Sequence, residues 1–371
     1  MKNPFVFGKI VDNSNFCNRE KEIMELKTAI ENNYSTWLFA PRRYGKSSLV
    51  KKVFSEVKGV TTIYFDLYNI KSTDDFSRKY SNTLSKKLFN WKNEIKEVSK
   101  SAVKYFKNLS PNITFDENGT PGINLISANI KEQERIETIL NVPEKIAQEQ
   151  NIKICIAFDE FQEIDRIDKF IINWMRSVFQ NQKNVCYVFL GSKQSLMQNI
   201  FTSINSPFYE YAIKMDIQAL KRVELINFIE QKFKTKNVEI SQDLINNILD
   251  KSRCHPHYTQ YFASVVFNML VAENKIDITD EWLDKIINAQ SDIFQNIYDQ
   301  LNNNQRLLLN VIANDEEEIF SKENRKKYDL PSTASMSVNI KALIKKDLIN
   351  KQKGSYFINN PILKEWILKI N

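Results

Sequence analysis

A nine-residue segment near the N-terminus combines lysine, arginine, glycine and hydroxyl side chains in an order suited to phosphate binding. Residues 40–48 match the pattern G-x-x-x-x-G-K-[ST], with alanine at the position of the first glycine. In this pattern, backbone N–H groups of the loop and of the following helix point at phosphate oxygens. The residues expected to contact the phosphates are Ala40, Pro41, Arg42, Arg43, Tyr44, Gly45, Lys46, Ser47 and Ser48.

Two residues of this loop have distinct predicted roles. Lys46 would reach the β- and γ-phosphate oxygens of a nucleotide, and the Ser47 hydroxyl would bind Mg²⁺. A helix cap flanked by surface arginines is the alternative for the motif alone. The predicted strand 35–39 before the loop and the predicted helix 46–57 after it favour the phosphate site. Alanine at position 40 bears on the affinity more than on the kind of ligand.

A second group of residues could complete a hydrolytic site. The apolar segment 154–158 ends in Asp159 and Glu160, as expected of a strand with carboxylates at its carboxyl end. Asp159 could hold hydrated Mg²⁺ through water, and Glu160 could polarise the attacking water. The alternative, two solvated acids at the end of a strand, is less favoured beside the Lys46 loop.

A third segment suggests a γ-phosphate sensor. The predicted strand 185–190 precedes Gly191, Ser192 and Lys193. In P-loop ATPases the strand next to the acidic one ends in a polar residue that senses the γ-phosphate, and Ser192 is the first candidate, before Lys193. An ordinary turn at the end of a buried strand explains this segment equally well when it is considered alone.

The surrounding sequence predicts a parallel sheet covered by helices, because short β-rich runs alternate with helical stretches. The expected strands are 35–39, 61–66, 154–159 and 185–190. The expected helices are 46–57, 72–88, 132–149 and 169–179. Residues 90–129 interrupt this alternation with a Lys- and Asn-rich stretch that contains two prolines and two glycines. We expect an insertion there, partly helical with a loop or hairpin.

After about Met215 the pattern changes to helices, followed by a three-helix and hairpin pattern typical of a winged helix-turn-helix. The predicted fold class is therefore an α/β P-loop NTPase core, a helical lid and a C-terminal winged helix. The expected domains are 1–215, 216–296 and 297–371.

The segments described so far, together with several others, resemble archaeal-type and Bacteroidetes-type ATPases of the AAA+/STAND branch of P-loop proteins. The similarity covers nearly the whole chain, with matching elements at 16–22, 40–48, 158–164, 189–193, 206–209 and 254–258. The resemblance implies that Arg19 and Glu20 lie against adenine and ribose, with Asn18 in place of the family's glycine. It also implies that Pro256, at the start of a lid helix, packs on the base or phosphates.

One feature departs from ring-forming relatives, which supply an arginine in trans to the γ-phosphate. Between Ser192 and Met215 the chain has no arginine. Arg176 is the substitute that the sequence offers, although its helical context favours a surface residue. The sequence therefore fits a slow ATPase that uses its nucleotide state as a switch at least as well as a ring motor.

The winged helix raises the question of DNA binding. From Ile297 onward there are 12 basic and 9 acidic residues, a difference of +3. The expected third helix begins at Ser332, and Asn339 is its first amide, whereas DNA readers usually place Arg, Asn or Gln earlier. Lysine contacts to phosphates and a purely protein-binding winged helix both remain open. The lysines that could contact phosphates are Lys345, Lys351 and Lys353.

The composition excludes several other classes. The 371 residues are 42% hydrophobic and 26% charged, which excludes global disorder, and the net charge of +7 is too mild to indicate nucleic acid. Four scattered cysteines and two histidines predict neither a disulfide framework nor a zinc site. No signal peptide is evident, and the longest nearly apolar run, 261–272, is too short to span a bilayer. A cytoplasmic location without membrane attachment is expected.

These observations predict Mg²⁺-dependent ATP binding and slow hydrolysis, coupled to movement of the lid and winged helix. ATP and Mg²⁺ are the expected ligands, with Glu160, Lys46 and Ser192 in catalysis and with Ser47 and Asp159 at the metal. Two alternatives are a nucleotide-gated adaptor without significant turnover and a winged-helix DNA-binding regulator. A protein partner and a homo-oligomer are both compatible with the sequence.

Overall fold

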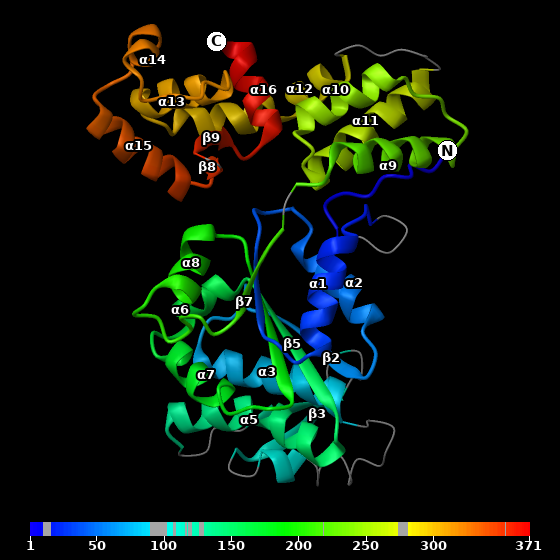
Figure 1. Ribbon diagram of the computed structural model, residues 1–371, viewed down its shortest axis with the longest axis vertical. Coiled ribbons are helices and arrows are strands. Elements are labelled where there is room, and N and C mark those ends of the chain that lie inside the picture. The colour runs from blue at the N-terminus through cyan, green and yellow to red at the C-terminus, as the bar shows by residue number, and fades with distance from the viewer. Residues whose placement is uncertain are drawn as a thin grey trace. The chain divides into compact units, whose positions relative to one another are not determined.

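The computed structural model describes most of the 371-residue chain, which forms two compact units (Figure 1). One unit is Ile10–Ala219, and the other combines Met1–Lys9 with Leu220–Asn371. The described residues are 1–9, 16–89, 102–106, 109–115, 117, 121–125, 130–217, 219–273, 281–352 and 354–371.

The first unit is built on a five-stranded parallel sheet in the order β2-β5-β6-β1-β7. Its strands are β1 Thr36–Phe39, β2 Val60–Asp66, β5 Lys153–Asp159, β6 Val185–Gly191 and β7 Ile213–Asp216. The four strands that the sequence predicts are confirmed. The short edge strand β7 was not predicted.

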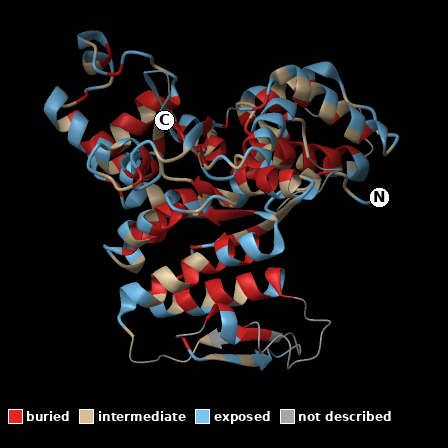
Figure 2. Ribbon diagram, turned by 60° about the horizontal axis from the view of Figure 1, so that its bottom comes forward, coloured by how far each residue is buried: buried red, intermediate tan, exposed pale blue. Residues whose placement is uncertain are grey.

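Helices cover both faces of this sheet, because successive strand side chains point to opposite faces and both sets are apolar. In β5, Ile154, Ile156 and Phe158 belong to the core under α3, α5 and α7, whereas Cys155 and Ala157 belong to the core under α1 and α2. Figure 2 shows the buried residues along the sheet and the inner helix faces. The helices of this unit are α1 Glu20–Glu31, α2 Lys46–Glu56, α3 Thr73–Leu88, α5 Glu132–Gln150, η2 Phe161–Glu163, α6 Ile164–Ile167, α7 Ile171–Phe179 and α8 Gln194–Thr202.

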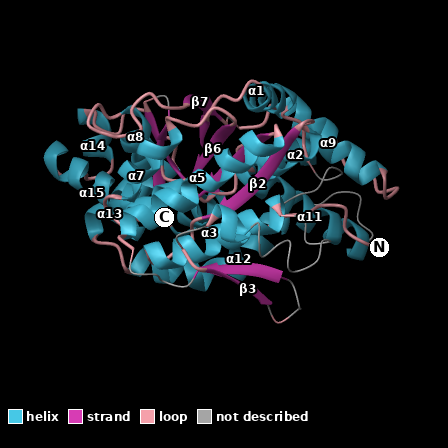
Figure 3. Ribbon diagram, turned by 90° about the horizontal axis from the view of Figure 1, so that it is seen from below, coloured by secondary structure: helices cyan, strands magenta, loops and turns pink. Residues whose placement is uncertain are grey.

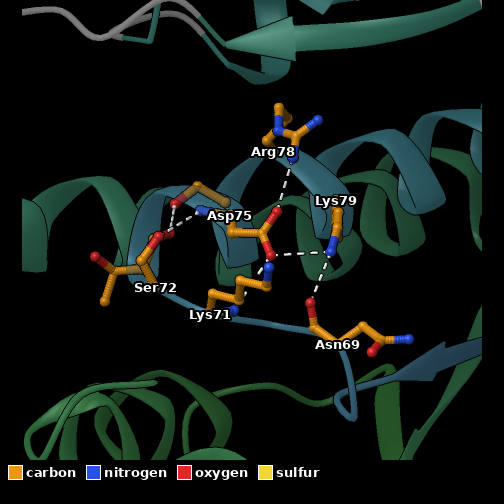
Figure 4. A network of polar contacts seen from close by, with 8 residues as sticks. Asn69, Lys71, Ser72, Asp75, Arg78 and Lys79 are labelled. Atoms are coloured by element: carbon orange, nitrogen blue, oxygen red, sulfur yellow. Dashed lines mark hydrogen bonds and ion pairs between the residues drawn. The ribbon is translucent and has the colours of Figure 1, made fainter. Parts of the chain in front are cut away.

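The turn between β2 and α3 is fixed by a polar network around Asp75 (Figure 4). The Ser72 hydroxyl caps α3 by accepting from the Asp75 N–H at 3.2 Å, a contact that typically contributes about 0.5–2 kcal/mol. The Asp75 carboxylate accepts from the Lys71 N–H, from Arg78 and from Lys79. Burial opposes its charge, but these donors together lower the pKa of Asp75.

Part of the segment 90–129 forms an antiparallel hairpin, β3 Pro111–Phe115 and β4 Pro121–Leu125. Its strands do not join the main sheet, and Figure 3 shows β3 apart from the labelled strands of that sheet. The hairpin was one of the forms expected for this insertion. Much of the rest of the insertion lies outside the described residues.

The second unit contains helices and a small hairpin, and it includes the predicted winged helix, which is confirmed. Its elements are α9 Arg222–Lys234, α10 Gln242–Ser252, α11 Pro256–Glu273, α12 Glu281–Asp299, α13 Asn303–Ala313, α14 Lys322–Lys327, α15 Thr333–Lys345, β8 Ile349–Gln352, β9 Ser355–Ile358 and α16 Pro361–Ile370. Among the described parts of the chain, no helix is long and apolar enough to cross a membrane.

The units differ from the expected domains 1–215, 216–296 and 297–371 in two respects. Helix α12 runs through position 297 and packs on α16, where Trp366 donates to Ser291 at 3.0 Å, so the lid and the winged helix form one unit. The N-terminal residues pack on lid helices instead of the core. Phe5 is 5% exposed against Phe233 and Phe267, and Asn3 donates to the Ser264 carbonyl at 2.9 Å.

Candidate functional site

The predicted chemical residues of the first unit lie at the carboxyl edge of its sheet. Strands β1, β5 and β6 are parallel and adjacent in the order β5-β6-β1, so their carboxyl ends meet at the same edge. Residues 40–48 leave β1 there and lead into α2 at Lys46. Asp159 ends β5, with Glu160 after it, and Ser192 follows β6. The fold therefore brings three separate sequence segments to one place.

Lys46 is a buried cation in this loop. Its side chain is only 6% exposed, and Nζ donates to the carbonyls of Ala40 at 2.9 Å and Pro41 at 3.3 Å. Burial lowers the pKa of Lys46, and the negative charges of Glu160 and Asp159 partly oppose that effect. Nζ therefore lies between loop carbonyls and carboxylates, and a phosphate group would supply further negative charge to stabilise it.

The loop and the acidic strand are joined by a direct hydrogen bond. Ser47 Oγ donates to Asp159 Oδ2 at 2.7 Å, as expected if both groups belong to one site. The Tyr64 hydroxyl, on β2, donates to the same carboxylate oxygen. Burial, followed by the charge of Asp159, raises the pKa of Tyr64, so its hydroxyl stays protonated and remains a donor.

Tyr64 has no counterpart among the residues predicted from sequence. The parallel register pairs Tyr64 with Ala157, two residues before Asp159, and this pairing brings the hydroxyl to the site. The sequence offered one signal for it: a tyrosine, whose ring carries a hydroxyl, lies two residues before Asp66, the last residue of a predicted strand.

Carboxylates gather at this edge. Asp66 is paired with Asp159 in the β2–β5 register, and Glu160 follows directly. Burial raises the pKa of Asp66, and the nearby charges of Asp159 and Glu160 raise it further, against the Tyr68 N–H that lowers it. A hydroxyl and several carboxylate oxygens are the hard donors that Mg²⁺ prefers, so this donor set fits that ion.

Glu160 has a constrained backbone and a fixed side chain. Its φ of 52° is left-handed, which is uncommon for a residue with a side chain. The Glu160 N–H donates to Asp159 Oδ1 at 2.9 Å, and its carbonyl accepts from the Glu163 N–H at 2.9 Å. Glu160 Oε2 accepts from Ser192 Oγ at 2.8 Å and also from the Gln162 amide. The predicted base and the predicted sensor therefore touch each other.

The remaining predicted nucleotide contacts of this unit are distributed around the loop. Arg19 is buried, and its guanidinium donates to the Tyr44 carbonyl at 3.0 Å and to Glu22 at 2.9 Å, so it braces the loop. Burial lowers the pKa of Arg19, and Glu22 opposes that effect. Gly45, which directly precedes α2, has a φ of 87°, a conformation that suits glycine. Among the other loop residues, the structure exposes Arg42 and Arg43 and buries Ser48.

Arg176 and Pro256, two further residues predicted from the sequence, belong to different units. Arg176 donates to the Pro207 carbonyl at 2.9 Å and lies over the Tyr211 ring at 4.7 Å, so it holds a loop of its own unit. Pro256 begins α11 in the second unit. Its contact with a nucleotide stays a prediction.

The strand order and the loop geometry define a P-loop ATPase of the AAA+ type. A family model described as "ATPase domain predominantly from Archaea" matches residues 16–255, and the chain belongs to this family. It is therefore an ATP-binding ATPase. A second model, described as a "probable winged helix domain", matches residues 292–369.

Solved structures share this fold at low sequence identity. A Walker-type ATPase of Pyrococcus abyssi is 16% identical with a TM-score of 0.67, over 98% of this chain and 99% of that one. The Aeropyrum pernix ORC2 protein is 13% identical, with a TM-score of 0.57 over 99% and 98% of the two chains. The ORC1 protein of the same organism is 11% identical, with a TM-score of 0.52 over 100% and 98%. No curated protein matches the chain.

Proposed function

We propose that the chain binds ATP with Mg²⁺ at the carboxyl edge of the β1, β5 and β6 strands and hydrolyses it slowly as a conformational switch. The observation that carries this proposal is the convergence of Lys46, the Ser47–Asp159 hydrogen bond and the Glu160–Ser192 hydrogen bond at one edge. Lys46 would neutralise phosphate charge, and Ser192 would sense the γ-phosphate. The Aeropyrum pernix ORC2 structure contains ADPNP and ADP, which supports a nucleotide ligand for this fold.

The proposed hydrolysis divides its work among neighbouring side chains. Ser47 and Asp159 would hold Mg²⁺, which supplies charge stabilisation for the phosphate oxygens. Glu160 would orient a water molecule and accept its proton as the water oxygen bonds to the γ-phosphorus. The bond from the γ-phosphorus to the β,γ-bridging oxygen would break at the same time, and ADP would leave with that oxygen. The backbone N–H groups of residues 40–48 would point at the phosphates. The residues around Arg19 would lie against adenine and ribose, and a contact between Pro256 and the nucleotide stays a prediction.

Two observations on arginine residues support slow turnover. Arg176 is engaged by the Pro207 carbonyl and by Gln180, and no arginine lies between Ser192 and Met215. An arginine at the γ-phosphate is worth about 10³–10⁵ in rate in the systems where it acts. Without it, the nucleotide state would persist long enough to act as a signal.

The switch is tested by comparing limited proteolysis of the full-length protein in Mg²⁺ with ADP and with a non-hydrolysed ATP analogue. Distinct cleavage patterns for the two nucleotides, together with measurable phosphate release, are expected. Identical patterns would refute switching, and nucleotide binding without phosphate release would favour a nucleotide-gated adaptor. Light scattering under the same two conditions distinguishes a single chain from an ATP-dependent assembly.

Tyr64→Phe is expected to raise the Mg²⁺ concentration needed for half-maximal ATP hydrolysis by about tenfold, because outer hydrogen-bond donors orient metal-binding carboxylates. The hydroxyl donates to Asp159 Oδ2, the oxygen that also accepts from Ser47. The measurement is phosphate release across a Mg²⁺ titration. Tyr34→Phe, at a tyrosine 56% exposed, is the control. An unchanged Mg²⁺ midpoint in Tyr64→Phe would contradict a metal role for Asp159 supported by this tyrosine.

A second candidate function is DNA binding through the winged helix without reading of bases. Asn339 is 9% exposed, donates to the Ser335 carbonyl at 2.9 Å and accepts from Asn302 at 3.1 Å, so it is engaged within the fold. The exposed cations of α15 and the wing are Lys341, Lys345, Lys346 and Lys351, while Lys353 lies outside the described residues. The Aeropyrum pernix ORC1 protein was solved in complex with DNA.

For this candidate, affinity for a short DNA duplex is expected to fall steeply with salt, with a log–log slope of about −0.9 per neutralised phosphate. Replacing Lys341 and Lys345 together by alanine should make this slope shallower by the contribution of about two phosphates. The change should be the same for DNA duplexes of unrelated sequence. Lys285→Ala, at an exposed lysine of α12, is the control. A flat salt dependence would contradict DNA binding and favour a protein-binding winged helix.

A further inference from the structure

Gln162 links the carboxylate of Glu160 to the turn that follows β6. Its side-chain Nε2 donates to Glu160 Oε2, and its Oε1 accepts from the Ser192 backbone N–H at 3.2 Å. Gln162 is 3% exposed, so both ends of its amide are used away from bulk water. With the 2.8 Å hydrogen bond from Ser192 Oγ to Glu160 Oε2, the three residues form a closed triangle.

Space for this amide depends on the glycine before Ser192. A Cβ built on Gly191 would lie 2.6 Å from Gln162 Oε1 and would also meet the Met197 side chain. Both neighbours are buried, and Gln162 could move only by giving up its bond to the Ser192 N–H. Gly191 thus provides the room that lets the amide reach the turn after β6.

The backbone conformation of Glu160 directs its side chain, and the Gln162 amide then holds the end of that side chain. A residue with a side chain is strained in the left-handed region, and Glu160 keeps this conformation where its surroundings over-determine it. Such a conformation aims the carboxylate in a direction that an ordinary strand end would not. A glutamate side chain nevertheless has free rotations beyond Cβ, so its end needs a partner to stay in place.

We propose that Gln162 is a positioning residue that fixes the Glu160 carboxylate and the Ser192 turn relative to each other during ATP hydrolysis. The proposal rests on the proposed role of Glu160 as the base. When Ser192 Oγ turns toward a γ-phosphate, it leaves Glu160 Oε2. The Gln162 amide then still holds that oxygen and, through Oε1, the Ser192 backbone. The other carboxylate oxygen, Oε1 of Glu160, is the one that accepts the proton from water.

Loss of this amide should affect the chemical step and spare nucleotide binding. Gln162→Leu, of similar size without hydrogen bonds, is expected to lower kcat about tenfold, part of the 10²–10⁴ that a positioned base contributes. The KM for ATP should stay within about twofold, because Gln162 reaches the base and the turn and is not itself a phosphate contact. Gln198→Leu, at an exposed glutamine on α8, is the matched control.

A second variant keeps the test valid if the Gln162→Leu protein does not fold. Gln162→Glu keeps the size and still offers an oxygen to the Ser192 N–H, but it turns the donor toward Glu160 into an acceptor. Its kcat should fall at least as far as that of the leucine variant when each protein is assayed well below its own melting temperature. Gly191→Ala, which crowds the same amide, should lower kcat in the same direction.

The deciding measurement is phosphate release in a Glu160→Gln background. Because a positioning residue acts through the base, Gln162→Leu should add less than about twofold once the base is absent. Equal losses in both backgrounds, a kcat within about twofold of the unchanged protein, or a weakened ATP affinity of the same size would each overturn the proposal. If Glu160→Gln itself leaves kcat unchanged, the proposed function of Glu160 fails instead, and the two failures are distinguishable.

Discussion

Lys46→Ala is expected to weaken ATP binding by about 10- to 100-fold and to lower turnover by about 10²–10³, the largest combined effect of any single change in this site. A charge-assisted hydrogen bond contributes about 1.5–3 kcal/mol, and loss of one preorganised donor at developing charge costs about 10²–10³ in kcat. Lys46 is 6% exposed, and little water is available to replace its ammonium group at a phosphate. Calorimetric ATP titration and phosphate release measure the two effects.

The fold should survive this substitution. Burial lowers the pKa of Lys46, which means that the folded protein disfavours the charge that alanine removes. The carbonyls of Ala40 and Pro41 lose a donor, which for a buried acceptor costs about 1–3 kcal/mol, less than the total stability of a typical domain. Lys58→Ala, at an exposed lysine after the same helix, is the control. Unchanged ATP affinity in Lys46→Ala, with the control also unchanged, would contradict phosphate binding by residues 40–48.

The central elements of the site could be predicted because each carries its own local signal. The glycine, lysine and serine of the loop lie between an apolar run and a helical pattern, and the structure has β1 and α2 there. Asp159 and Glu160 follow an unbroken apolar run, which is typical of a parallel strand buried on both faces. Parallel strands place their carboxyl ends at one edge, so local signals were enough to bring these segments together.

The features that were missed depend on partners distant in the sequence. Strand β7 has four residues, and only Met215 among them is buried, so no apolar run marks it. Its existence depends on pairing with β1, about 180 residues earlier in the chain. Tyr64 and Gln162 likewise acquire their contacts from the register of β2 on β5 and from the turn after β6. Neither residue type is unusual in its own segment.

The N-terminal segment illustrates the same limit at the level of domains. Sequence order places Phe5 beside the ATPase core, whereas its ring packs on Phe233 and Phe267 of the other unit. An apolar side chain indicates that it will be buried, but it does not identify the surface that buries it. The boundary expected at 297 falls within α12, a continuous helix that packs on both α11 and α16, and the sequence pattern alone does not show these two contacts.

Glu160→Gln is expected to lower kcat for ATP hydrolysis by about 10²–10⁴ while ATP binding persists, because an amide cannot accept the proton of the attacking water. Glutamine keeps the size of the side chain and an oxygen that can accept from Ser192 Oγ and from Gln162, so the triangle can be retained. Single-turnover phosphate release and ATP affinity, measured on the same preparation, separate the chemical step from binding.

The comparison with Lys46→Ala makes this result specific. Lys46→Ala should lose affinity as well as turnover, whereas Glu160→Gln should accumulate the ATP-bound state. If that state is the active signal of the switch, the Glu160→Gln protein should hold the proteolysis pattern of the non-hydrolysed analogue in the presence of ATP itself. Asp165→Asn, at an exposed acid five residues later, should behave as the unchanged protein. Full hydrolysis by Glu160→Gln would assign water activation to another group, and the cluster of Asp66 and Asp159 would be the next place to test.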